Sequence, residues 1–133
     1  MKLNLISTSI LMNYNEEILI GKRSSSSELF PNYWEFPGGK VERGETPETA
    51  LIRELKEELS ITVLKENLVP YQFISHSYEN FHAIILCFKC SNWSGEIQKN
   101  THDELVWANS TCVNKYEFLP ANLKLIQDLF TKS

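Results

Sequence analysis

Residues 38–61 constrain the fold more strongly than any other part of the chain. After a glycine-containing loop, apolar residues recur at the spacing of one helix face, at Ala50, Leu51, Leu55 and Leu59. Thr46 is suited to act as the N-cap, and Pro47 suits the first helical position, where a backbone N–H is not needed. The segment therefore predicts an amphipathic helix that begins at Pro47 and buries its apolar stripe.

Much of the remaining chain shows the two-residue alternation of β-strands. Strand character is found in residues 3–12, 16–23, 71–78, 81–90 and 103–110. We expect the first two to pair around a turn at residues 13–15, and residues 121–130 to form a closing helix behind Pro120. His76 and His82 fall within strands and are expected to be polar strand residues, not ligands. Strands flanking isolated helices predict an α/β (α+β) layered domain with a mixed sheet.

Composition limits the number of domains and the kinds of partner. The 133 residues, 42% of them hydrophobic, predict a single domain over residues 1–133. A net charge of -4 argues against a nucleic acid polymer as partner, because phosphate binding needs a basic face. No run is long enough to span a membrane, and the first residues do not resemble a signal peptide. Three cysteines favour reduced thiols in the cytoplasm, with Cys87 and Cys90 on opposite faces of one strand.

The predicted helix carries three glutamates on one face. Glu54, Glu57 and Glu58 stand at i, i+3 and i+4, so their carboxylates project within about one turn. Each like-charged pair destabilises a helix by about 0.2–0.5 kcal/mol, and a divalent cation with oxygen ligands would reverse this effect. A solvated acidic face is the simpler alternative. The glycine pair before the helix favours the cation, because bare backbone lets a metal or phosphate approach.

With its spacing, this segment resembles the signature of the Nudix hydrolases. The signature positions are filled by Gly39, Glu45, Arg53, Glu54, Leu55, Glu57, Glu58 and Ile61. Ser60 departs from the pattern, since the family has a helix-ending glycine there, and serine enters the left-handed conformation only at a cost. The stretches GKR, EFPGGK, WSGE and FLPAN extend the similarity to the MutT branch over most of the chain.

The resemblance implies a fold and a metal site. The fold would be a Nudix-like α/β/α sandwich with a mixed central sheet, a catalytic loop and helix, and a C-terminal helix. The cofactor would be Mg²⁺, with Mn²⁺ as a substitute. Its implied ligands are Glu54, Glu57, Glu58 and the backbone carbonyl of Gly38. An ion pair between Arg53 and Glu45 would complete the catalytic set by holding the loop against the helix.

The resemblance also implies a nucleotide site. Arg23 matches a residue that contacts the phosphate, and Asn122 matches the asparagine that reads the purine edge. The backbone of Glu35 and Phe36 lies beside the base in that branch. Simpler alternatives stay open: Asn122 as an N-cap of the last helix, Arg23 as a rim cation, and Trp34 or Phe36 as core residues alone.

Two further positions depart from the MutT branch. Many relatives carry another metal-binding glutamate in the loop where Thr101 stands, and Asp103 or Glu104 is the alternative after a small loop shift. An arginine of a relative also has no clear match among residues 80–82. The fourth carboxylate and the base preference are therefore left open.

The implied reaction is attack of a water molecule on phosphorus, which releases a nucleoside monophosphate and pyrophosphate. Glu54 is the first choice for the general base, with Glu57, Glu58 and Glu104 as alternatives. The leading function is sanitation of the nucleotide pool by hydrolysis of 8-oxo-dGTP. Hydrolysis of CTP, dCTP or a nucleoside diphosphate sugar is the alternative, and a non-catalytic nucleotide-binding module comes third. The expected partner is a small nucleotide, and the protein is expected to be a monomer or weak dimer.

Overall fold

The computed structural model describes residues 2–130 of the chain. Its strands and helices are, in order, β1 (Lys2–Leu11), β2 (Ile18–Lys22), β3 (Trp34–Glu35), β4 (Gly38–Lys40), α1 (Pro47–Leu59), β5 (Val69–Ser77), β6 (Phe81–Cys90), β7 (Glu104–Ala108) and α2 (Leu123–Phe130). Short 3₁₀ turns lie at Lys65–Asn67, Val113–Lys115 and Pro120–Asn122. No helix within residues 2–130 is long and apolar enough to cross a membrane.

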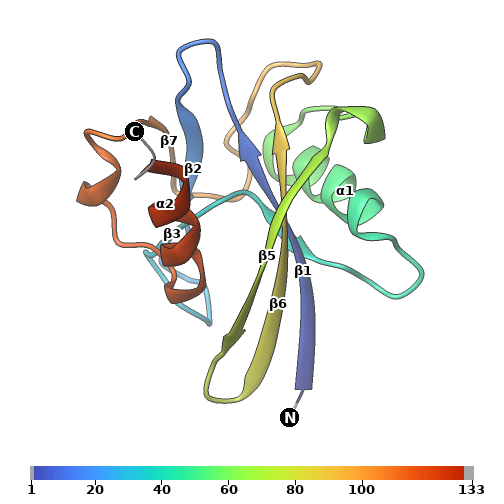
Figure 1. Ribbon diagram of the computed structural model, residues 1–133, viewed down its shortest axis with the longest axis vertical. Coiled ribbons are helices and arrows are strands. Elements are labelled where there is room, and N and C mark those ends of the chain that lie inside the picture. The colour runs from blue at the N-terminus through green and yellow to red at the C-terminus, as the bar shows by residue number, and fades with distance from the viewer. Residues whose placement is uncertain (1, 131–133) are drawn as a thin grey trace.

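Within residues 2–130, the strands form two sheets. The larger sheet has the order β4-β1-β6-β5, in which β1 and β6 run parallel and the other neighbours run antiparallel. The smaller sheet has the order β3-β2-β7 and is antiparallel. In Figure 1 the long strands stand in the centre, with α1 on one side and α2 on the other. The predicted α+β class with a mixed sheet and two helices is confirmed.

The hydrophobic core lies in two parts, one on each face of the larger sheet. One part packs Ile10, Ile85 and Cys87 together with Leu125 and Ile126 of α2. The other packs the apolar stripe of α1 against strand residues that include Leu11, Phe88 and Cys90. Cys87 and Cys90 thus lie on opposite faces, as the two-residue period predicts, and both are free thiols.

The predicted pairing of the first two strands is wrong. β1 and β2 meet only at one isolated bridge, between Met12 and Ile18. β1 instead lies between β4 and β6, so its backbone groups are already paired on both edges. The chain therefore turns away from β1 after residue 12, and β2 pairs with β3 and β7. The short strands β3 and β4 were not predicted, because two or three residues show no periodicity.

The helix α1 begins as the sequence predicts. Thr46 is the N-cap, with its hydroxyl accepting a hydrogen bond from the backbone N–H of Thr49, and Pro47 follows at the first helical position. Ala50, Leu51, Leu55 and Leu59 are fully buried. Glu54 and Glu58 lie beside this apolar stripe and meet the glycines of β4, while Glu57 is exposed.

The C-terminal end of α1 accommodates a serine where a glycine is typical. Ser60 has φ 59° and ψ 29°, the left-handed conformation. Asn100 donates from Nδ2 to Ser60 Oγ at 2.8 Å and to the carbonyl of Glu57 at 3.0 Å. The Asn100 backbone N–H donates to the carbonyl of Glu58 at 3.2 Å. The loop before β7 therefore caps the end of the helix that carries Glu57 and Glu58.

Candidate active site

Two glycines bring β4 into direct contact with its neighbours. A Cβ added to Gly39 would overlap the carboxylate of Glu54, so only glycine leaves space for that side chain. A Cβ on Gly38 would overlap the backbone of Ser7 and Thr8 in β1. The backbone N–H of Gly38 donates to Glu58 Oε1 at 3.3 Å. The glycine pair thus seats two helix carboxylates against bare backbone at one edge of the sheet.

The site glutamates lie close enough to oppose one another's ionisation. Burial, followed by the charges of Glu35 and Glu54, raises the pKa of Glu58 to about 9, although the hydrogen bond from Gly38 lowers it. Burial, followed by a side-chain hydrogen bond with Glu57, raises the pKa of Glu54 to about 7. Negative charge at this place is therefore unfavourable unless a cation accompanies it.

Arg53 ties the glycine-rich loop to the helix. Its Nε donates to Glu45 Oε2 at 2.7 Å and its Nη2 to Glu45 Oε1 at 3.0 Å, a two-bond arrangement that fixes the orientation of both groups. Nη2 also donates to the carbonyl of Lys40 at 3.1 Å, and Nη1 lies 3.4 Å from Glu57 Oε1. The hydrogen bond from Arg53 lowers the pKa of Glu45, so this carboxyl stays ionised. The ion pair that the resemblance implies is present.

The carboxylates fit a cation that is shared with a substrate. Within residues 2–130, no three His, Cys, Asp or Glu side chains form a ready metal cluster. The side chain of Glu57 is 56% exposed and is directed to Arg53, while Glu54 and Glu58 contact the glycine backbone. Mg²⁺ is usually held by one or two carboxylates, with water and substrate phosphates as its other ligands. The donor set suits that mode of binding and not a closed protein cage.

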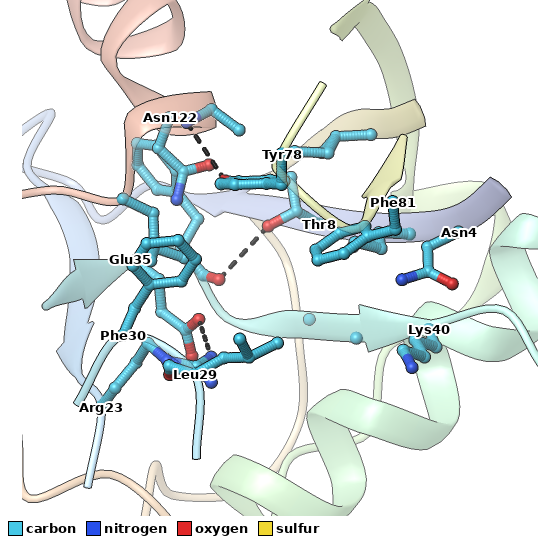
Figure 2. Close-up of a pocket in the computed structure, with 17 residues that line it drawn as sticks. Asn4, Thr8, Arg23, Leu29, Phe30, Glu35, Lys40, Tyr78, Phe81 and Asn122 are labelled. Atoms are coloured by element: carbon cyan, nitrogen blue, oxygen red, sulfur yellow. Dashed lines mark hydrogen bonds and ion pairs between the residues drawn. The ribbon is translucent and has the colours of Figure 1, made fainter. Parts of the chain in front are cut away.

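A cavity of about 220 Å³ adjoins the glycine pair. It lies between the larger sheet and the segments around β3 and α2, and Gly38 and Gly39 form part of its wall. Figure 2 shows side chains converging on it from segments far apart in the sequence, among them Thr8, Arg23, Glu35, Tyr78 and Asn122. The cavity therefore opens where the backbone contacts Glu54 and Glu58.

The structure brings together all four predicted substrate-binding residues. Arg23, Glu35, Phe36 and Asn122 line this cavity. Phe36 also stacks on Phe118 with ring centroids 6.0 Å apart, so it serves both core and cavity. Trp34 is 7% exposed, packs edge-on against Tyr116, and does not line the cavity, so it is a core residue.

The side chain of Asn122 does not cap the last helix. Asn122 ends the 3₁₀ turn just before α2 and is only 5% exposed. Its backbone N–H donates to the carbonyl of Leu119, but its amide group makes no hydrogen bond to any residue from 2 to 130. Since it lines the cavity, the amide has both a donor and an acceptor available for a ligand.

An aromatic wall in this cavity was missed by sequence reasoning. Tyr78 stacks with Phe81 at 4.9 Å between ring centroids and contacts Phe30 at 5.3 Å. The Tyr78 hydroxyl accepts a hydrogen bond from the backbone N–H of Ala121, beside Asn122. Phe30 belongs to a loop whose residues show no periodicity, so its approach to the β5–β6 turn had no sequence signal.

The histidines of β5 and β6 behave as predicted. His82 hydrogen-bonds the hydroxyls of Ser75 and Ser77, and His76 packs against the edge of Tyr78. Neither histidine lines the cavity. Both are therefore polar strand residues.

The loop before β7 does not supply the fourth carboxylate in the expected way. Thr101 is exposed, the carboxylate of Asp103 accepts from the backbone N–H of Ser25 at 3.1 Å, and Glu104 lies 3.5 Å from Lys22 Nζ. Both acidic side chains thus have partners outside α1. The side chain of this loop that reaches the cavity residues is His102, 2.9 Å from Glu35, and no motif pointed to it.

Comparison with known proteins defines the family. The model of the NUDIX domain matches residues 4–129. The 8-oxo-dGTP diphosphatase of Escherichia coli K12 is 34% identical over 124 residues, 93% of this chain and 94% of that protein. The CTP pyrophosphohydrolase of the same strain is 34% identical over 113 residues, 84% and 80% of the two chains. A MutT structure from work on Aliivibrio salmonicida and Vibrio cholerae has a TM-score of 0.80 at 28% identity, covering 98% of each chain.

The chain therefore belongs to the NUDIX family. Membership makes it a nucleotide hydrolase of a class that depends on divalent metal ions. The Nudix-like fold that the resemblance implies is confirmed as well.

Proposed function

We propose that this protein hydrolyses nucleoside triphosphates to the monophosphate and pyrophosphate, with 8-oxo-dGTP as its main substrate. One observation carries the proposal: a cavity lined by Arg23, Phe36 and Asn122 opens at Gly38 and Gly39, beside the helix glutamates. A nucleotide placed there would direct its phosphates to the glutamates and its base to Asn122. The 34% identity to the E. coli 8-oxo-dGTP diphosphatase supports this substrate.

Glu54, Glu57, Glu58 and the carbonyl of Gly38 would hold the metal ion, and Mg²⁺ is the proposed ion, with Mn²⁺ as a substitute. The ion supplies charge neutralisation at the phosphates and activates a water molecule when bound. Glu54 is the proposed general base, because its carboxylate packs against Gly39 where the cavity begins. Glu57 and Glu58 are the alternatives for that role. Arg53 and Glu45 keep the loop and the helix in register.

The base is proposed to lie between the aromatic wall and Asn122. The amide of Asn122 both donates and accepts, so it can distinguish base edges by their pattern of donors and acceptors. Tyr78 and Phe81 offer flat apolar surface for stacking. Stacking tolerates any base, so selectivity would come mainly from Asn122.

The second candidate is hydrolysis of a pyrimidine triphosphate such as CTP or dCTP. It is favoured by the similarity to the E. coli CTP pyrophosphohydrolase and by the aromatic wall, which would accept a smaller base equally well. Hydrolysis of a nucleoside diphosphate sugar is the remaining alternative, and a pure binding module has little need for three carboxylates on neighbouring turns of one helix. We also propose that residues 1–133 act as one domain, as a monomer or weak dimer, in a reducing cytoplasm that suits three free thiols.

A substrate panel tests the proposal. Purified protein with Mg²⁺ is assayed against 8-oxo-dGTP, dGTP, CTP, dCTP and ADP-ribose, with kcat/KM and released pyrophosphate measured for each. We expect the highest kcat/KM for 8-oxo-dGTP. A preference for CTP or dCTP would replace the main substrate by the second candidate, while no turnover of any nucleotide would contradict the hydrolase assignment.

A substitution in the metal site tests the chemistry. We expect Glu57→Gln to fold normally and to lose most of its activity, because the amide cannot replace a carboxylate as a cation ligand. Glu66→Gln, at an exposed position in the 3₁₀ turn Lys65–Asn67, is the matched control and should remain active. Near-normal turnover of Glu57→Gln at saturating Mg²⁺ would remove Glu57 from the metal site.

A further inference from the structure

His102 is a buried histidine that the proposed chemistry does not use. It is 6% exposed and lies in the loop just before β7. A Cβ on Gly21 of β2 would come within 2.6 Å of its imidazole ring, so the ring packs directly on bare backbone. This packing leaves the ring little freedom to rotate, and its position is therefore defined by the fold.

The Nε2 atom of His102 contacts a residue of the nucleotide cavity. It lies 2.9 Å from Glu35 Oε2, and the other oxygen of that carboxylate, Oε1, accepts from Arg23 Nη1 at 2.8 Å. An ionised carboxylate can only accept, so His102 must donate from Nε2. The side chains of His102 and Glu35 are 3% and 15% exposed, which shields this pair from competing water.

Arg23 is fixed in turn. Its Nε donates to the carbonyl of Leu29 at 3.1 Å, while Nη1 is held by Glu35. Its Nη2 makes no hydrogen bond to any residue of the described chain 2–130, and Arg23 lines the cavity (Figure 2). The guanidinium therefore has one edge held by the protein and further donor capacity for an anionic ligand.

The second ring nitrogen of His102 shows which tautomer is present. Nδ1 is buried and has no hydrogen-bond partner in the described part of the chain. A buried N–H without an acceptor costs more than a bare lone pair, so the proton belongs on Nε2. The arrangement thus commits the histidine to a single donor bond, directed at Glu35.

We propose that His102 is a positioning residue for nucleotide binding. By donating to Glu35 it holds the carboxylate that orients Arg23, and so sets where the guanidinium meets the nucleotide phosphates. Its role rests on the proposed function, because Arg23 is useful in this place only if an anionic substrate occupies the cavity. The loop that contains His102 lacks the expected metal-binding glutamate. Through His102, this loop contributes to substrate binding and not to the metal site.

Two substitutions of His102 whose side chains differ in length test this role. The amide nitrogen of glutamine lies near the place of a histidine Nε2, whereas the shorter asparagine mimics only Nδ1. We expect His102→Asn to raise KM by about tenfold with little change in kcat, because ground-state and transition-state binding are weakened alike. His102→Gln should recover most of this loss. The control is His82→Asn, on the sheet face opposite to the cavity residues Phe81 and Ile85, where KM should not change.

A measurement without turnover separates this inference from the function. The Arg23 Nη1 protons, which donate to Glu35, should give resolved, slowly exchanging NMR signals in the wild type and in His102→Gln, and lose them in His102→Asn. Equal KM values for the asparagine and glutamine variants, or an unaltered Arg23 signal in both, would overturn the positioning role. An inactive wild type with the expected change in the Arg23 signal would contradict the proposed function while leaving the link from His102 to Arg23 intact.

Discussion

At the residue scale, the geometry of the site depends on positions where a side chain is absent. The missing Cβ of Gly39 is the clearest case, because any side chain there would occupy the place of the Glu54 carboxylate. Gly44 stands in the same loop, but a Cβ added there would meet no atom of the described residues 2–130 within 4 Å, apart from Gly44 and its chain neighbours. The two glycines are therefore needed for different reasons. Gly39 leaves space for the Glu54 side chain, whereas Gly44 adopts a backbone φ of 86°, which favours glycine.

Gly39→Ala is expected to reduce kcat/KM by about 100-fold, because displacing a carboxylate of the proposed metal site by roughly 1 Å can have that effect. The thermal unfolding temperature should change much less, since the strand β4 is short and at the sheet edge. Gly44→Asn is the control, because asparagine tolerates a positive φ, and it should keep its activity. Full activity of Gly39→Ala, measured beside this control, would mean that Glu54 can move without loss of function.

Residue spacing predicted the members of the site but not their partners. The Nudix-like signature points to Glu54, Glu57 and Glu58 as the proposed metal ligands, because a helix places i, i+3 and i+4 on one face without help from the rest of the fold. The link between Glu35 and His102 joins residues 67 positions apart. No local rule connects such a pair, so the sequence contained no signal for it.

The end of α1 shows a compensation at the scale of an element. Serine in the left-handed conformation is unfavourable by about 1–2 kcal/mol relative to a helical residue. The side-chain and backbone hydrogen bonds from Asn100 to Ser60, Glu57 and Glu58 offset that cost. The departure from the family glycine was visible in the sequence, but its compensation 40 positions later was not.

Asn100→Ala is therefore expected to lower the free energy of unfolding by about 1 kcal/mol, a usual value for lost hydrogen bonds of this kind. It should also raise the Mg²⁺ concentration needed for half-maximal activity, since the turn carrying Glu57 and Glu58 loses its support. Urea denaturation and a metal titration measure the two effects. Asn114→Ala, in the exposed turn Val113–Lys115, provides the comparison. Equal stability of the two variants would show that Asn100 does not stabilise the helix end.

Elements with strong internal periodicity were predicted well, and elements defined by their neighbours were not. The helix α1 begins at the predicted residue because its cap, proline and apolar stripe lie within a few positions of one another. The hairpin expected from β1 and β2 does not form, because both edges of β1 are already paired, with β4 and with β6. These partners lie elsewhere in the sequence, so no local pattern indicates them. β4 was invisible because its residues, Gly38–Lys40, have low strand propensity and owe their conformation to β1.

The stability of the whole molecule should depend on pH through the site glutamates. Glu58 and Glu54 have pKa values raised from 4.5 to about 9 and about 7. The metal-free folded state therefore holds protons that the unfolded chain releases. Their contribution to stability is fully present below pH 4.5 and is lost as the pH rises through the folded pKa values.

We expect the metal-free protein to be less stable at pH 8.5 than at pH 5.5, as measured by urea denaturation in the presence of a chelator. Glu58→Gln should flatten this dependence, because it removes the group with the larger shift. Adding Mg²⁺ should restore stability at pH 8.5 in the wild type. A pH dependence that is the same in the wild type and in Glu58→Gln would show that Glu58 does not titrate as described.

The sequence by itself determined the class of the protein, through a glycine loop, the capped amphipathic helix that follows it, and the spacing of the carboxylates on that helix. These features are local, since capping, helical periodicity and glycine freedom act over a few neighbouring residues. Only the tertiary structure decided the cavity, where Thr8, Arg23, Tyr78 and Asn122 meet from four distant segments. The same holds for the path from His102 through Glu35 to Arg23. Such meetings depend on how two sheets pack, and packing is set by the burial of the whole core and not by any one stretch of sequence.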